Sequence, residues 1–275
     1  VGFKGVLVSY PDDSDIIRKF RNVHGDEKKH FFFRKSMYKV TFDAKRRNYL
    51  EICRYATADG GDGSLNRQFI MGLCALGISH ETILELLKRQ IKKLNGALTD
   101  SHMALNSFTG YDELFDYKGK ILQTALKTCE TSTDMLDPFV RLMTEDARAQ
   151  ILEQVGLGTI KLKVTESRYV IGIADDSGQL KAGEVYFTLP SVELHGRQVL
   201  VSRNPAGHPG DFRVFTVNNR IRELSHIEGA IAFSIDLKSN DVPAPPMMGG
   251  GDLDGYVSLF VSTFHTIFAV SPPVT

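Results

Sequence analysis

The chain has 275 residues, 42% hydrophobic and 24% charged, a balance typical of a globular protein with a buried core. Lys and Arg equal Asp and Glu at 33 each, so the overall charge neither requires nor excludes a polyanionic partner. No apolar run reaches the roughly 18 to 20 residues of a membrane span, and the N-terminal residues lack the pattern of a secretory signal, so we expect an intracellular protein with no membrane partner. The three cysteines lack C-x-x-C spacing, so we expect neither a disulfide framework nor a zinc site.

Positive charge is concentrated at the start of the chain. Residues 1–50 hold 12 Lys or Arg against 6 Asp or Glu. A run of this kind is usually a solvated surface, and a polyanion-binding surface is the alternative. Two strands are predicted in this region, over residues 4–10 and 30–42, with a polar loop between them.

Helices are predicted in the middle of the chain. Leu65, Phe69, Leu73 and Leu76 lie on one face of a segment that ends at Gly77. A second helix begins after Ser79 as N-cap and ends at Gly96. A third covers residues 137–156, with Pro138 in its first turn and Gly156 at its end.

Beyond Gly158 the pattern changes to short β-rich runs with turn residues between them. They cover residues 159–164, 169–175, 184–189, 198–203, 212–217, 230–235 and 256–261. Strands at this density favour a barrel or a sandwich over a βαβ sheet. We therefore predict a domain boundary near Gly158.

Asp252 and Asp254 lie two residues apart in the glycine-rich stretch "MMGGGDLDGYVSLF". On extended backbone such residues project to the same side, about 7 Å apart, so both carboxylates could bind one cation. Mg²⁺ accepts one or two carboxylates and completes its shell with water and phosphate oxygens. The alternative is a surface hairpin turn at Asp254 and Gly255, which needs no chemistry. An EF-hand does not fit, because Tyr256 and Thr263 occupy its fifth and twelfth positions.

Longer motifs surround this acidic pair. The stretch "SRNPAGHPGDFR", residues 202–213, followed by "GGGDLDGY", resembles the R-N-P-x-x-H-P-G-D-x-R and D-L-D-G-D motifs of the cellular RNA-dependent RNA polymerases of RNA silencing. Further similarity lies in "LNRQ", in "GIADDSGQLKAGEV", in "FKGVL" and in "FRKSMYKV", where Lys35 replaces a proline of the family pattern. The resemblance covers nearly the whole chain in the family's order.

The resemblance implies an α+β polymerase core in which two double-psi β-barrels face each other across a catalytic cleft. Residues 1–50 would be a remnant of the first barrel, residues 51–158 a helical connector, and residues 159–275 the second barrel with the aspartate loop. We expect a catalytic-core fragment of a longer polymerase, or a truncated paralogue. The basic excess of the first 50 residues would then face RNA or a nucleoside triphosphate.

The activity implied is RNA-directed RNA synthesis, in the cytoplasm, the nucleus or both, with an RNA template, nucleoside triphosphates and RNA-silencing proteins as partners. The site residues that the resemblance implies are Asp252 and Asp254 as catalytic metal ligands for Mg²⁺ or Mn²⁺, and Lys4, Arg34, Lys39, Arg203 and Asn204 as nucleotide- or RNA-binding residues. A structural role in the turn is an equal alternative for Arg203. For His208 we expect a hydrogen bond that stabilises the turn.

Tyr256 departs from the family pattern, because it stands where the third aspartate is expected. A phenol with an ordinary pKa near 10 is neutral at pH 7 and is a poor Mg²⁺ ligand. The alternative function is therefore a catalytically inactive homologue that retains RNA binding. An unrelated Mg²⁺-dependent phosphotransfer or nuclease domain is a third hypothesis, against which the R-N-P-x-x-H-P-G-D stretch argues.

Overall fold

The computed structural model describes residues 2–24, 31–40, 51–52, 55–56, 63–108, 112–128, 137–156, 161–236, 244–249, 253 and 258–263. The chain forms two compact units. The first combines Val1–Gly60 with Arg168–Phe264, and the second combines Gly61–Ser167 with His265–Thr275. The barrel strands lie almost entirely in the first unit, and the long helices of the middle of the chain lie in the second.

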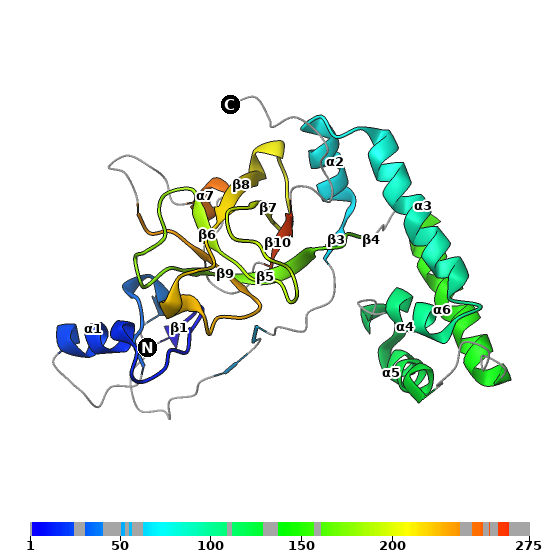
Figure 1. Ribbon diagram of the computed structural model, residues 1–275, viewed down its shortest axis with the longest axis horizontal. Helices are drawn as coiled ribbons and strands as arrows, with labels where there is room; N and C mark the ends of the chain where they lie inside the picture. The colour runs from blue at the N-terminus through cyan, green and yellow to red at the C-terminus, as the bar shows by residue number, and fades with distance from the viewer. Residues whose placement is uncertain are drawn as a thin grey trace. The chain divides into compact units, whose positions relative to one another are not determined.

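A closed six-stranded barrel forms most of the first unit (Figure 1). Its strands are β5 (Ser167–Ala174), β6 (Glu184–Tyr186), β7 (Gln198–Arg203), β8 (Phe212–Val217), β9 (Ala230–Phe233) and β10 (Ser258–Thr263), in the order β10-β5-β9-β6-β8-β7. The pairs β5–β9 and β6–β8 are parallel, whereas β6–β9, β7–β8 and β7–β10 are antiparallel. The mixed barrel confirms the α+β class predicted from the sequence.

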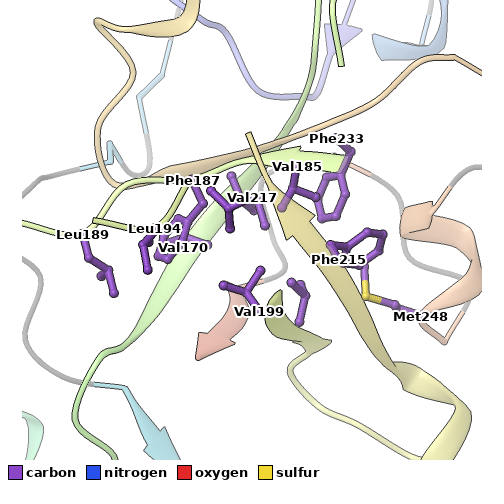
Figure 2. Close-up of a cluster of buried hydrophobic side chains, with 12 residues drawn as sticks. Val170, Val185, Phe187, Leu189, Leu194, Val199, Phe215, Val217, Phe233 and Met248 are labelled. Carbon is purple, nitrogen blue, oxygen red and sulfur yellow. The ribbon is translucent and has the colours of Figure 1, made fainter. Parts of the chain in front are cut away.

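Side chains of the strands fill the barrel. Val199 and Val201 of β7, with Val217 of β8, are fully buried among the residues drawn in Figure 2. Phe215 and Phe233 meet edge to face, with ring centroids 5.7 Å apart. Burial alternates over residues 215–217 of β8, whereas residues 199–202 of β7 are all buried.

A short ribbon and a helix precede the barrel in the first unit. Strand β1 (Gly2–Phe3) pairs antiparallel with β2 (Tyr38–Val40), helix α1 covers Asp15–His24, and a 3₁₀ helix covers Lys35–Met37. The strand predicted over 4–10 is wrong. Val6 and Val8 instead pack against the buried cluster around Ile173 and Leu180, and residues 4–10 form no strand. Within the described residues 31–40, the strand predicted over 30–42 is confirmed only as β2, because residues 35–37 form a 3₁₀ helix.

The second unit is helical, with α2 (Arg67–Ala75), α3 (His80–Gly96), α4 (Ser101–Phe108), α5 (Asp112–Thr128), α6 (Pro138–Gly156) and a small ladder of β3 (Ser64–Leu65) and β4 (Leu162–Lys163). Ser79 caps α3 by accepting the amide of Thr82, as predicted. Gly77, at φ +96°, ends α2 as predicted, and the amide of Ile78 reaches the carbonyl of Leu73 as in a Schellman motif. Among the described helices, none combines the length and apolar character needed to cross a membrane.

Candidate active site

The turn that follows β7 is held by side chains of its own motif. Asp211 is buried, and its Oδ2 accepts the amides of Gly207 and His208 at 2.9 Å each. The Nδ1 of His208 accepts the amide of Gly210 at 2.9 Å and caps the 3₁₀ helix Pro209–Asp211. The predicted turn-stabilising role of His208 is confirmed. Because its Nδ1 is an acceptor, the neutral ring carries its proton on Nε2.

Arg203, the last residue of β7, connects this turn to the segment before the acidic pair. Its Nη1 donates to the carbonyl oxygen of Gly249 at 2.8 Å. Gly249 follows helix α7 (Ala244–Met247) and has φ +65°, and a Cβ there would lie 3.4 Å from Oδ1 of Asp211. The Nε–H of Arg203 is buried and finds no acceptor in the described part of the chain. The guanidinium therefore has a structural partner at Nη1, and its buried Nε–H has no acceptor among the described residues.

The residues described on either side of the acidic pair lie beside Arg203. Gly249 receives the Arg203 hydrogen bond on one side of the loop, and on the other side Leu259 of β10 lies opposite Arg203 in the β7–β10 ladder. Leu253, between the two aspartates in sequence, packs against the barrel core. Asp252, Asp254 and Tyr256 lie outside the described residues. Among the residues described, no three His, Cys, Asp or Glu side chains gather as a metal site.

The predicted lysines lie at the β1–β2 ribbon, with Lys39 in β2 and Lys4 directly after β1. The amide of Lys4 donates to the carbonyl of Met37 at 2.9 Å, and Phe3 is paired with Tyr38, the residue before Lys39. Lys4 and Lys39 are both exposed. Gly5 permits this close approach, since a Cβ there would lie 2.7 Å from Cγ of Met37. Two cations that are 35 positions apart in sequence thus become neighbours on one ribbon.

Arg34 and Asn204 have different surroundings. The guanidinium of Arg34 binds Oδ1 of Asp176 at 2.6 Å, and the hydroxyl of Tyr10 donates to Oδ2 of the same carboxylate at 3.4 Å. Burial first, and then the charge of Asp176, raise the pKa of Tyr10 above its ordinary value, so the phenol stays protonated as a donor. Asn204 is half-buried and follows Arg203 directly, with a cis peptide bond to Pro205.

The Arg34–Asp176 pair is expected to couple the first segment to the barrel with measurable energy. Its side chains are 39% and 17% exposed, so we expect a coupling of about 1 kcal/mol, the upper end for solvent-accessible pairs. The measurement is a double-mutant cycle of unfolding free energies with Arg34→Ala, Asp176→Ala and both. A coupling near zero, as expected for the fully surface pair of Arg89 and Glu85, would contradict a role in fixing the segment.

Sequence reasoning missed Tyr10 and Asp176. Asp176 lies in the stretch "GIADDSGQLKAGEV", where the sequence predicts no contact for it, and the preceding Asp175 forms a turn by accepting the amides of Ser177 and Leu180 at 2.9 Å each. Tyr10 is 166 positions from Asp176, and no local pattern signals their contact. The pair of adjacent acids was the signal in the sequence. One carboxylate, that of Asp175, is sufficient for the turn, so that of Asp176 can bind a distant cation.

Comparison with known proteins places these motifs in one family. The family described as RNA dependent RNA polymerase matches residues 1–268 of this chain. Among the curated relatives, RNA-dependent RNA polymerase 6 of Arabidopsis thaliana is 26% identical over 281 residues, which cover 92% of this chain and 21% of the relative. RNA-dependent RNA polymerase 1 of Schizosaccharomyces pombe is 26% identical over 232 residues, covering 75% of this chain and 18% of the relative.

A solved structure shares the fold. RNA-dependent RNA polymerase QDE-1 from Thielavia terrestris superposes with a TM-score of 0.56 at 19% sequence identity, over 80% of this chain and 27% of that chain. The similarity confirms the expected double-psi barrel architecture of a polymerase core with helices. The chain spans about a fifth of the length of the curated relatives that it matches.

Proposed function

Because the chain belongs to the RNA-dependent RNA polymerase family, we propose that it carries part of an RNA-directed RNA polymerase core, which transfers nucleotides from triphosphates to an RNA 3′ end in gene silencing. The observation that carries the proposal is the family match over residues 1–268, with the motif turn after β7 joined by Arg203 to the stem of the acidic loop. We further propose the three-part division into residues 1–50, 51–158 and 159–275. Silencing proteins as partners and a cytoplasmic or nuclear location belong to the same proposal.

Asp252 and Asp254 are proposed as the metal ligands. Two carboxylates in a glycine-rich loop are the hard oxygen donors that Mg²⁺ prefers, and Mn²⁺ accepts the same ligands. When bound, such a cation lowers the pKa of an attacking hydroxyl and neutralises the charge of the leaving oxygen. The role of this chain is to hold the loop at its stem, where Arg203 binds Gly249 and Leu253 packs on the core.

The basic residues are proposed to bind phosphates. Lys4 and Lys39, exposed on one ribbon, supply two neighbouring charges for the triphosphate. Arg203 and Asn204 contact the nucleotide beside the loop, and the unsatisfied Nε–H of Arg203 supports a further acceptor there. Arg34 would contact RNA only by exchanging the carboxylate of Asp176 for a phosphate.

The alternative function is RNA binding without catalysis, and Tyr256 is the observation that favours it. Replacing the third carboxylate by a neutral phenol removes one charge and one metal ligand from the loop. Under this alternative the basic ribbon and the barrel would still hold RNA.

Extension of a labelled RNA in Mg²⁺ by the chain and by its Tyr256→Asp variant separates the two functions. We expect Tyr256→Asp to raise the extension rate at least tenfold, because the third carboxylate is restored, which corresponds to about 1.4 kcal/mol of barrier. Asp254→Asn, placed in the same variant, is the matched control and should abolish the gain. Lack of extension by both proteins, with RNA binding intact, would contradict the polymerase proposal and favour the alternative.

A further inference from the structure

We propose that Phe3, Phe33 and Tyr38, here called the aromatic cluster, form a stacking site for unpaired bases of an RNA strand. The inference rests on the proposed function for its choice of RNA as the occupant. It adds a site distinct from the acidic loop and from the lysines proposed to bind triphosphate.

The three rings of the aromatic cluster are organised by the β1–β2 ribbon. Phe3 and Tyr38 are cross-strand partners, and their rings meet edge to face with centroids 5.7 Å apart. Phe33 stacks on Phe3, with centroids 4.5 Å apart and planes inclined by 21°. The rings are therefore held in a fixed arrangement by one another and by the ladder, before any ligand arrives.

The same rings are left open to solvent. Phe3 is 47% exposed, Phe33 42% and Tyr38 45%, and Phe31, two residues before Phe33, is 62% exposed. Large aromatic rings gathered at one place and half open to water are a feature of binding surfaces. Every nucleobase has an apolar π-face that can stack on such a ring, so an ordered and exposed aromatic cluster suits an unpaired strand.

The charges around the aromatic cluster favour a polyanion over a protein surface. Residues 2–11 and 31–40 contain four cations, Lys4, Arg34, Lys35 and Lys39, and no Asp or Glu. One of the four, Arg34, is paired with Asp176 at 2.6 Å, so Lys4, Lys35 and Lys39 supply the local excess of positive charge. Stacking rings within a basic segment are the combination that single-stranded nucleic acid requires.

The ribbon carries cations beside its rings. Lys39 lies between Tyr38 and Val40, which pair with Phe3 and Gly2, so it occupies an irregular point of the ladder, and it is exposed. Lys39 is already assigned to the proposed nucleotide site, and an RNA strand stacked on the rings needs a further cation for its phosphates. Lys35, which is exposed and two residues from Phe33, is the cation available to the phosphates of that strand.

The test is the affinity of the 275-residue chain for a fluorescein-labelled single-stranded RNA of about 12 nucleotides, measured by anisotropy at several salt concentrations. Phe33→Leu should weaken binding roughly tenfold, within the range for loss of one base stack, and should leave the salt dependence unchanged. Phe33→Tyr keeps a stacking ring and should retain the affinity. Lys35→Gln should instead reduce the slope of log K against log salt by about 0.7.

The matched control is Phe139→Leu, which removes a more exposed ring from helix α6, since Phe139 is 59% exposed and Phe33 is 42% exposed. It should not change RNA affinity, and equal weakening by this control would overturn the inference. Circular dichroism spectra and thermal unfolding of each variant establish whether it is folded. If Phe33→Leu does not fold, Tyr38→Leu provides the second test.

Two outcomes separate this inference from the proposed function. If Phe33→Leu and Tyr38→Leu bind RNA like the parent while Lys35→Gln binds less tightly, the rings do not stack on bases, and the stacking site is overturned while the polymerase proposal stands. If RNA binding depends on Phe33 but neither the parent nor Tyr256→Asp extends RNA, the stacking site is supported and the polymerase proposal is contradicted.

Discussion

Replacing Phe233 by alanine is expected to lower the free energy of unfolding of the barrel unit by about 3–5 kcal/mol. Phe233 is 2% exposed, its ring meets Phe215 edge to face, and it ends β9, which is bonded to β5 on one side and to β6 on the other (Figure 2). Removal of the ring leaves a cavity within a closed barrel, whose walls cannot move inward without breaking ladder hydrogen bonds.

Hydrogen exchange of peptides from β7 and β8 measures this loss within the barrel unit, separately from the helical unit. Such resolution is needed because the chain has two compact units and no tryptophan to report on one of them. Ile235→Ala is the matched control, since Ile235 is 52% exposed just beyond β9, and it should cost less than about 1 kcal/mol. A loss below that value for Phe233→Ala would show that the barrel core is not packed as described.

Asp211→Ala is expected to destabilise the same unit by about 2–4 kcal/mol. The carboxylate is 7% exposed and is the acceptor for two amides, those of Gly207 and His208. Alanine would leave both amides without their acceptor in a part-buried turn, and each unsatisfied donor costs about 1–3 kcal/mol. The side chain also lies against Gly249, so the stem of the acidic loop would lose a neighbour.

Asp211→Asn separates the hydrogen-bond acceptor from its charge. The amide oxygen of asparagine can accept the same two amides, so this variant should recover most of the stability and lose about 1 kcal/mol, the difference between a charged and a neutral acceptor. Chemical denaturation followed by exchange of the 198–217 peptides is the measurement. Equal losses for the two variants would indicate that the negative charge, and not the pair of hydrogen bonds, stabilises the turn.

Sequence patterns correctly predicted the helices whose ends are marked by capping residues, proline or glycine. Ser79 caps α3, Gly77 ends α2 at positive φ, and α6 runs from Pro138 to Gly156, each as expected. Helix α1 was missed because Ser14, whose Oγ accepts the amide of Ile17, lies in an acidic stretch interpreted as a loop. Residues 4–10 alternate like a strand, and tertiary packing of Val6 and Val8 overrides that tendency.

The motif resemblance nominates the candidate site residues, whereas their contacts could not be predicted from the sequence. The motif resemblance placed Arg203 near the acidic loop, and the structure adds its bond to Gly249, a residue 46 positions away. No spacing rule links Lys4 with Lys39, because their proximity depends on the β1–β2 pairing. Arg34 was predicted to bind nucleotide or RNA, and its pairing with Asp176 depends on how residues 31–40 lie against the barrel, which sequence patterns alone do not specify.

The closing strand of the barrel has a consequence for biosynthesis. β10 completes the barrel by pairing with β7 over five residue pairs, although β8, β9 and α7 lie between them in sequence. While a ribosome is still translating this region, the apolar edge of β7 waits without its second neighbour until residues 258–263 emerge. An unpaired edge of this composition attracts other strands. Nascent chains of this protein therefore pass through an aggregation-prone interval that ends only when the loop bearing the aspartates has been made.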